Sequence, residues 1–229
     1  MKKVVVFTGA GVSADSGIAT FRSSDGLWAN YRIEDVCTPT ALATNRNVVI
    51  EFYNKRRREM LEKSPNAGHY AIAELEKYFE VEVITQNVDN LHERAGSSSV
   101  LHLHGELTKL RSQRDPKLIY HIDGWEQYMD DRAPNGDLLR PHIVFFGEDV
   151  PLFTQATKIT ATADILIVVG TSLAVYPAAS LLHYAQPQTP IYLVDPQLPN
   201  CDLIKNKIYH IASRSAEGLP KLVDLLKNL

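Results

Sequence analysis

The chain has 229 residues, with 24 Lys and Arg against 27 Asp and Glu, which gives a formal charge of −3 at pH 7. This near-neutral charge argues against a nucleic-acid partner, and no run of 18 apolar residues is present to cross a membrane. Its two cysteines, Cys37 and Cys201, are too few and too far apart for a disulfide framework or a four-cysteine zinc site. The N-terminus also lacks the features of a signal peptide, so we expect a cytoplasmic protein.

The chain begins with an apolar segment and a glycine-rich turn. Residues 4–7 are apolar and mostly β-branched, which predicts a buried strand. Gly9 and Gly11 follow in the sequence TGAGVS, and they allow a sharp turn close to a ligand. Successive N–H groups in a turn that enters a helix form a site for a pyrophosphate. The segment therefore predicts a dinucleotide site, the alternative being a tight connection without a ligand.

The residues after this turn disfavour a hydride-transferring dehydrogenase. The usual dinucleotide fingerprint has an acid about 20 residues further on, at the end of a second strand. Here residues 18–28 form a polar, glycine-containing loop instead, in which three large side chains stand out: Phe21, Arg22 and Trp28. Nucleotide binding remains the prediction, but by another class of enzyme.

Further strand and helix patterns alternate along the chain. We predict strands at residues 80–85, 100–103, 142–146, 164–170, 190–195 and 207–211, and helices at 66–79, 177–186 and 216–229. The late strands are apolar at consecutive positions, as in a parallel sheet that is covered on both faces. This alternation predicts an α/β fold with a Rossmann-like parallel sheet.

Two stretches break the alternation and predict a smaller inserted domain. Residues 29–64 are helical and charged, and residues 107–140 are polar with several turn signals. The predicted Rossmann-like domain then consists of residues 1–28, 65–106 and 141–229. Ligands in such folds bind between the inserted domain and the carboxyl edge of the sheet.

Polar side chains follow two of the predicted strands. Gln86, Asn87 and Asp89 come after strand 80–85, where they would face the same crevice as the glycine turn, although an Asx turn or a helix cap would also explain them. His102 and His104 alternate onto one face at the end of the next strand. Histidine suits proton transfer near neutral pH. The alternatives are a structural histidine and a zinc pair, for which no cysteine or carboxylate set stands nearby.

Ordered motifs now extend along nearly the whole chain: GAGVS at 9–13, GI at 17–18, FR at 21–22, TQNVD at 85–89, HLHG at 102–105, FGE at 146–148 and GTS at 170–172. Together they resemble the signature of the sirtuins, which are NAD-dependent protein lysine deacylases. The segments 26–28 and 52–58 resemble the branch that includes bacterial sirtuins and the mitochondrial desuccinylase.

This resemblance implies a role for each matching residue. His104 matches the general base, and Asn87 and Asp89 match the pair that orients the NAD ribose and nicotinamide. The implied cofactor contacts are Gly9, Ala10, Gly11, Ser13, Phe21, Arg22, Trp28, Gln86, Asn87, Asp89, Gly170, Thr171, Ser172, Asp195 and Ala212. The implied wall of the acyl-lysine tunnel, which pairs with the substrate backbone, is Val144, Phe145, Phe146 and Gly147.

The implied reaction consumes NAD as a co-substrate. The acyl oxygen of a modified lysine attacks C1′ of the nicotinamide ribose, and nicotinamide leaves. His104 then takes a proton from the ribose hydroxyls, one of which attacks the acyl carbon, and water completes the release of lysine and O-acyl-ADP-ribose. The alternatives are an NAD glycohydrolase or ADP-ribosyl transferase in the same pocket, and a non-catalytic NAD sensor. Tyr53, Arg56 and the intact His104 argue against the first alternative, because an acyl tunnel and a base are retained. The intact Asn87, Asp89 and His104 argue against the second.

Tyr53 and Arg56 lie three residues apart on a predicted helix and therefore share one face. A pair with this spacing holds the distal carboxylate of succinyl-lysine in the desuccinylase branch, and an Arg fork suits a carboxylate. The resemblance thus implies that succinyl and malonyl groups are accepted besides acetyl. The alternative is a solvated face, which the neighbouring Lys55, Arg57 and Arg58 favour. We expect Arg57 to point about 100° away and to contribute little.

The sequence departs from the family in the small domain. Most sirtuins have a four-cysteine zinc ribbon, but residues 107–140 contain no cysteine, and Ser112 stands where the first is expected. We predict that no zinc is bound and that an apolar cluster replaces it: Leu118, Ile119, Tyr120, Ile122, Trp125, Tyr128 and Met129. Asp195 stands where many relatives have Asn, and it could accept hydrogen bonds from ribose hydroxyls.

Overall fold

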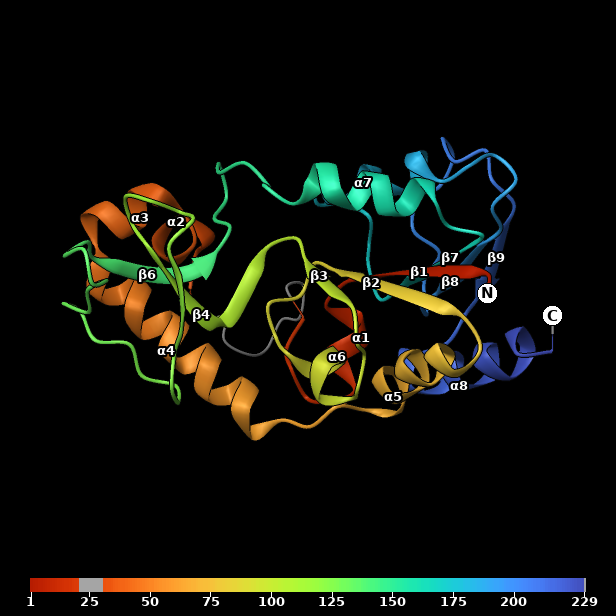
Figure 1. Cartoon of the computed structure of the whole chain (residues 1–229), viewed down its shortest axis with the longest axis horizontal. Coiled ribbons are helices and arrows are strands. Elements are labelled where there is room, and N and C mark those ends of the chain that lie inside the picture. Colours follow the sequence, from red (N-terminus) through yellow and green to blue (C-terminus); the bar gives the residue numbers. More distant parts are fainter. Residues whose placement is uncertain (21–30, 229) are drawn as a thin grey trace.

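A six-stranded parallel sheet forms the centre of the larger part of the molecule (Figure 1). The computed structural model describes residues 1–20 and 31–228. The strand order is β3-β2-β1-β7-β8-β9, and Thr8 is level with both Thr85 and Val169, so three neighbouring strands end at the same edge. The strands are β1 (Lys3–Thr8), β2 (Glu80–Thr85), β3 (Val100–His102), β7 (Ile165–Val169), β8 (Ile191–Val194) and β9 (Ile208–Ile211). This arrangement confirms the predicted parallel α/β fold.

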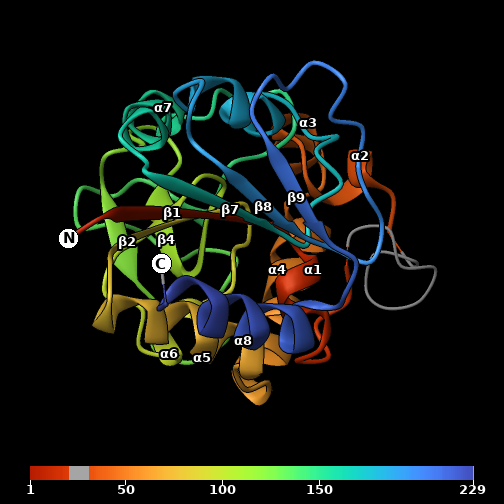
Figure 2. The ribbon, with the colours of Figure 1, turned by 90° about the vertical axis from the view of Figure 1, so that its right-hand side faces the viewer.

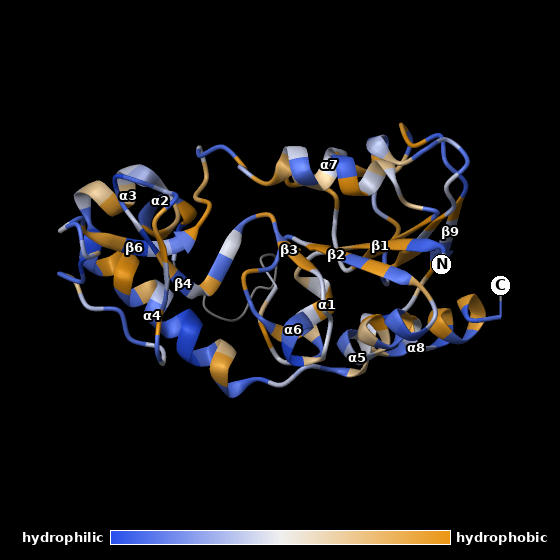
Figure 3. Cartoon of the chain, in the orientation of Figure 1, coloured by the Kyte–Doolittle hydropathy of each residue, from blue (hydrophilic) through white to orange (hydrophobic). Residues whose placement is uncertain are grey.

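Helices cover both faces of this sheet (Figure 2). Val4 and Val6 of β1 pack with α5 (Ala67–Glu74) and α8 (Ser215–Leu226) on one face. Val5 and Phe7 point to the other face, toward α7 (Phe153–Ala161) and the 3-10 helix η3 (Ala178–Tyr184). The alternation of side chains along a strand therefore places β1 in two cores. Figure 3 shows hydrophobic residues along the strands of the parallel sheet, and both hydrophobic and hydrophilic residues along α8.

The inserted part of the chain forms a second, antiparallel sheet of order β5-β4-β6. Its strands pack with the long helix α4, and the shared core includes Phe52, Tyr53, Leu107, Ile143 and Phe145. Figure 1 shows this part at the opposite end from the N- and C-termini. Its elements are α2 (Ile33–Val36), α3 (Pro39–Thr44), α4 (Arg46–Glu62), β4 (Gly105–Ser112), β5 (Ile119–His121) and β6 (Leu139–Ile143). Because β6 spans residue 140, the exact domain boundaries stay a prediction.

The structure corrects several predicted elements. The strand expected at 142–146 is β6, which ends at Ile143, and the polar stretch 107–140 contains most of β4 and all of β5. Helix α7 was not predicted, and the helix expected at 66–79 is α5 followed by the 3-10 turn η2 (Leu75–Lys77). Two short helices, α1 (Gly11–Ala14) and α6 (Leu91–Arg94), complete the fold. No helix in the described part of the chain is long and apolar enough to cross a membrane.

The small domain has a core beside Ser112 that includes only part of the predicted cluster, Tyr120 and Ile122. Leu110, Ala133 and Leu139 are buried together, with Tyr120 and Ile122 packed against them. Four other members, Ile119 of β5 and Trp125, Tyr128 and Met129 of the segment after it, are instead 36–59% exposed. The Ser112 hydroxyl donates to the Asp137 carboxylate at 2.8 Å and accepts from the Arg114 and Asp115 amides. A polar turn therefore occupies the place where the first zinc cysteine was expected.

Arg57 is buried, so the alternative of a solvated face is wrong for this residue. Its Nε donates to the Leu107 carbonyl at 2.6 Å, and its Nη1 donates to the Trp125 carbonyl at 2.7 Å and to Asn54 Oδ1 at 2.9 Å. Burial lowers the pKa of the guanidinium to about 10, which leaves it charged at neutral pH. The segment from Leu107 to Trp125 covers this face of α4, and Arg57 ties the two together.

Candidate functional site

A cavity of about 620 Å³ lies between the carboxyl edge of the parallel sheet and the small domain. Its lining comes from the β1–α1 turn, the residues after β2, β3 and β7, helix α4, and the segment after β6. This volume is within the usual range for small-molecule and cofactor sites. The site thus forms where the sequence predicted it, at the edge where parallel strands end.

Gly9 and Gly11 allow the turn between β1 and α1 to lie against the turn that follows β7. A Cβ added to Gly11 would lie 2.5 Å from the Cα of Gly170, and one added to Gly9 would lie 2.8 Å from the Gly170 carbonyl. The amides of Gly9, Gly11, Val12 and Ser13 donate to backbone carbonyls. These amides therefore do not provide the predicted row of N–H groups for a pyrophosphate. Gly9, Ala10, Gly11 and Ser13 nevertheless line the cavity.

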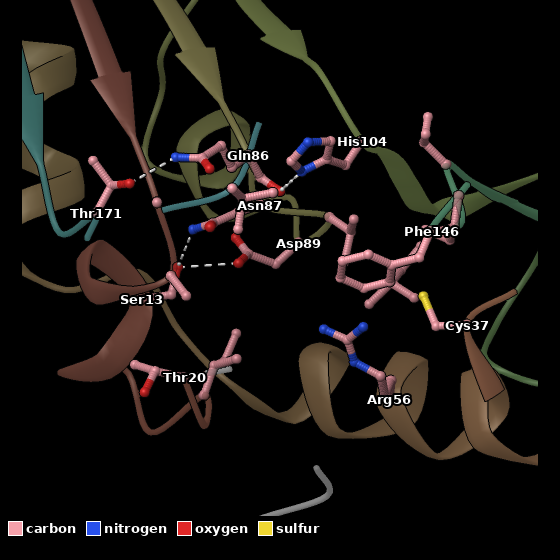
Figure 4. Close-up of a pocket in the computed structure, with 18 of the residues that line it drawn as sticks. Ser13, Thr20, Cys37, Arg56, Gln86, Asn87, Asp89, His104, Phe146 and Thr171 are labelled. Carbon is pink, nitrogen blue, oxygen red and sulfur yellow. Dashed lines mark hydrogen bonds between the residues drawn. The ribbon is translucent and has the colours of Figure 1, made fainter. Parts of the chain in front are cut away.

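Ser13 connects the polar residues that follow β2 (Figure 4). Its hydroxyl donates to Asp89 Oδ2 at 3.0 Å and accepts from Asn87 Nδ2 at 3.2 Å. The other Asp89 oxygen accepts from the Leu91 amide at 3.1 Å, so the predicted Asx turn is also present. Burial raises the pKa of Asp89, against the lowering effect of these bonds. Gln86 Nε2 donates to Thr171 Oγ1 at 2.9 Å and links this group to the end of β7.

His104 faces the cavity with a defined tautomer. Its Nδ1 lies 3.0 Å from the Gln86 carbonyl, which only accepts, so Nδ1 carries the proton and Nε2 keeps a lone pair. Burial lowers the pKa of His104 and keeps the ring neutral at neutral pH. These properties suit a proton acceptor.

His102 does not line the cavity, although the sequence predicted it on the same face as His104. Its Nδ1 bonds the Asn87 carbonyl at 2.9 Å, and its Nε2 bonds Glu93 at 2.7 Å. Burial lowers the pKa of His102, but the bond and charge of Glu93 outweigh it and raise the pKa. Contrary to the expectation from the sequence, carboxylates do lie near His102. Glu93, His102 and Glu106 are close enough to hold a metal ion, the one such group within residues 1–20 and 31–228.

The small-domain end of the cavity is formed by Tyr53 and Arg56 of α4. The Tyr53 ring is completely buried, stacked on Phe145 with centroids 5.7 Å apart and edge-on to Phe52 at 5.1 Å. Figure 4 shows Arg56 pointing from α4 into the cavity. Both side chains line the cavity, so the alternative of a solvated face is wrong for this pair. The sequence did not single out Cys37, whose sulfur lies 3.1 Å from the Tyr53 hydroxyl.

The segment after β6 forms one wall of the cavity, through Val144, Phe145, Phe146 and Gly147. The Val144 amide donates to the His104 carbonyl, and the Phe146 amide donates to the Cys37 carbonyl, both at 2.9 Å. The Glu148 carboxylate accepts from the Phe145 amide at 2.8 Å. It is held in turn by Arg140 and Arg111. The wall is therefore fixed by its backbone to both His104 and Cys37.

The remaining predicted residues fall into three groups. Gly170, Thr171, Ser172 and Asp195 line the cavity. Ala212, which is exposed directly after the end of β9, does not line it. Phe21, Arg22 and Trp28 lie outside the described residues. The sequence analysis missed several lining residues that no short motif marks: Cys37, Glu59, Leu107 and Tyr176.

Comparisons with known proteins agree with this geometry. Residues 9–177 match the Sir2 family. The chain is 56% identical over 196 residues to an NAD-dependent protein deacylase of Aggregatibacter actinomycetemcomitans, covering 86% of this chain and 93% of that protein. It is 50% identical to one of Bacteroides thetaiotaomicron, covering 99% and 98%.

Solved structures give the same result. A Sir2 homologue in complex with NAD superimposes with a TM-score of 0.88 at 37% identity, covering 99% of this chain and 90% of that one. A mutant Sir2 homologue in complex with ADP-ribose superimposes with a TM-score of 0.90, also at 37% identity, covering 99% and 92%. The chain therefore belongs to the Sir2 family, the sirtuins.

Proposed function

We propose that the protein is an NAD-dependent protein lysine deacylase that removes acetyl, succinyl and malonyl groups and releases nicotinamide and O-acyl-ADP-ribose. One observation carries the proposal: a neutral histidine with a fixed tautomer shares a cavity with a Tyr and Arg pair. The names of the deacylase relatives and the NAD and ADP-ribose complexes of the structural neighbours support it.

The residues present fit NAD. The cavity is large enough for a dinucleotide, and its polar groups gather at the strand ends, where ligands of such sheets bind. Asn87 and Asp89, joined through Ser13, would hold the nicotinamide ribose. Thr171 and Asp195 would hold the adenosine half. When bound, NAD supplies the ribose carbon and the hydroxyl that receive the acyl group.

His104 would act as the general base. Its Nε2 lone pair can take a ribose hydroxyl proton, because Nδ1 is held on the Gln86 carbonyl. Burial favours the neutral ring, so the base is ready at neutral pH. The bond from Val144 to the His104 carbonyl fixes the base relative to the wall that would hold the substrate.

Tyr53 and Arg56 would select the acyl group. A guanidinium can bind a carboxylate through two parallel hydrogen bonds, and the Tyr53 hydroxyl can donate a third. The apolar side chains around them, Phe145 and Leu107 among them, exclude water from this end of the cavity. The main chain of residues 144–147 would pair with the substrate backbone, with little dependence on sequence. The expected partners are therefore acylated lysine side chains of many proteins.

One assay separates this proposal from its alternatives. The protein is incubated with NAD and acetylated or succinylated peptide, and the products are identified by mass spectrometry. A deacylase gives free lysine and O-acyl-ADP-ribose in equal amounts. Free ADP-ribose with intact acyl-lysine would show an NAD glycohydrolase, an ADP-ribosylated acceptor would show a transferase, and unchanged NAD would show a binding module.

A further inference from the structure

Cys37 occupies a position in the cavity that the proposed reaction does not use. It follows helix α2 and lines the cavity, as Tyr53 and Arg56 do, and Figure 4 shows it between Arg56 and Phe146. Its sulfur lies 3.1 Å from the Tyr53 hydroxyl oxygen. Among the described residues, this sulfur is the one side-chain hydrogen-bond partner of the Tyr53 hydroxyl. The Cys37 carbonyl also accepts from the Phe146 amide at 2.9 Å. The Cys37 thiol therefore lies between two parts of the cavity: the Tyr53 and Arg56 pair, and the wall formed by residues 144–147.

We propose that Cys37 sets the balance between uncharged and acidic acyl groups by acting as a weak, replaceable partner of the Tyr53 hydroxyl. With an uncharged acyl group in the cavity, the hydroxyl keeps its bond to the sulfur. With an acidic acyl group, the hydroxyl turns its proton to the carboxylate. The inference rests on the proposed function, because it needs a carboxylate to reach Tyr53.

Two aromatic rings pack against the Tyr53 ring, whereas its hydroxyl proton can rotate about the C–O bond. The ring is fully buried and is held by Phe145 and Phe52. The phenol oxygen therefore stays in place, and the hydroxyl needs some acceptor, since a buried unpaired hydroxyl is unfavourable. A replaceable acceptor at this position lets one rigid site serve two kinds of substrate.

A thiol is suited to this role because its sulfur is only a weak acceptor. Hydrogen bonds to an ionised carboxylate are about twice as strong as neutral ones, so an acidic acyl group readily displaces the sulfur. Burial raises the pKa of Cys37, which keeps the thiol neutral. A thiolate would compete with the incoming carboxylate and repel it. Arg56 and Arg140 are the charged groups that act on this thiol, and both are cationic.

The test compares Cys37→Val with the parent enzyme. Valine is close to cysteine in size but cannot accept a hydrogen bond. The substrates are one peptide carrying butyryl-lysine or succinyl-lysine, which differ mainly in the terminal carboxylate. Because only the butyryl complex uses the sulfur, the ratio of kcat/KM for succinyl to butyryl should rise by about three- to tenfold in the variant. Cys37→Ala should raise it as well and serves if the valine variant does not fold.

Two controls identify the cause. Tyr53→Phe removes the hydroxyl, so adding Cys37→Val to it should leave the ratio unchanged. Cys201→Val changes the second cysteine, which lies away from the cavity, and should also leave the ratio unchanged. A change in the Tyr53→Phe background, or opposite changes in the valine and alanine variants, would show that side-chain volume decides and would overturn the proposal.

The outcomes for Cys37 and for the proposed function are distinct. If the parent enzyme removes butyryl but not succinyl groups, the acidic-acyl part of the proposed function fails, and the inference on Cys37 fails with it. If the parent removes both and Cys37→Val leaves the ratio unchanged, only the role of Cys37 is refuted.

Discussion

Arg57 Nε and the Leu107 carbonyl are joined by a 2.6 Å hydrogen bond that links helix α4 to strand β4. The same guanidinium also donates to the Trp125 carbonyl. One buried cation therefore holds three parts of the small domain together, while its neighbour Arg56 faces the cavity.

Arg57→Met should destabilise the protein. Methionine fills much of the space but leaves the buried Leu107 carbonyl and the partly buried Trp125 carbonyl without their donor, at a cost of about 2–5 kcal/mol. Urea unfolding measures the loss. The matched control is Arg58→Met, an exposed position whose ion pair with Glu62 at 3.6 Å should change stability by less than about 1 kcal/mol. If both substitutions lowered the free energy of unfolding equally, the buried hydrogen bonds of Arg57 would not be what holds the small domain together.

Arg56→Met should reduce desuccinylation far more than deacetylation. Without Arg56 the substrate carboxylate is desolvated and loses its charged partner, a cost of about 2–5 kcal/mol. The measurement is kcat/KM for succinyl-lysine and acetyl-lysine forms of one peptide, with Arg58→Met as the control. An equal fall for both substrates would mean that Arg56 supports the fold or the cofactor.

His104→Ala should remove deacylation but leave NAD binding largely intact. Loss of a general base typically reduces the rate about 10²–10⁴-fold. Single-turnover rates and calorimetric titration with NAD give the two quantities. Activity within a few-fold of the parent would rule out His104 as the base.

The pH profile should reflect the burial of His104. A base acts only when unprotonated, and burial lowers its pKa, so the ring loses its proton at a lower pH than an exposed histidine does. The acid limb of kcat/KM should therefore lie below about pH 6.5, the ordinary value for histidine. The profile should be measured with the acetylated peptide. The carboxylate of a succinyl group is itself ionisable, so its own titration would add to the acid limb. An acid limb above pH 7 would contradict the assignment.

The small domain should keep its fold without zinc. Ser112 and Asp137 form a polar turn beside the cluster of Leu110, Ala133 and Leu139, with no cysteine present. A strong chelator should leave the melting temperature unchanged, and elemental analysis should find far less than one zinc per chain. About one zinc per chain would refute this, and substitution of His102 would then test the group of Glu93, His102 and Glu106.

The sequence predicted those parts of the structure that local patterns determine. The apolar run of β1 and the polar residues after β2 place the sheet edge and the cavity correctly. The partners of Arg57 could not be predicted, because Leu107 and Trp125 are 50 and 68 residues away in the sequence. Helical spacing gives only the direction of a side chain, and the covering segment decides whether that direction is solvent or core.

Cys37 was missed for a related reason. A single cysteine carries no spacing signal, and the role proposed for Cys37 depends on its contact with Tyr53, which lies on helix α4. The glycines show the opposite case. Their positions were recognised and they line the cavity, but the close contact that requires them in the structure is with the backbone of Gly170. A glycine indicates close approach without identifying what approaches.

This contact between turns joins the two halves of the parallel sheet. Gly11 belongs to the turn after β1 and Gly170, with φ of +57°, to the turn after β7, and a Cβ on either would collide with main-chain atoms of the other. No side chain can move aside to relieve such a collision. Evolution and protein engineering can therefore change the acyl end of the cavity by exchanging side chains. The opposite end, where the turns of Gly11 and Gly170 meet, is constrained by main-chain contacts that no such exchange relieves.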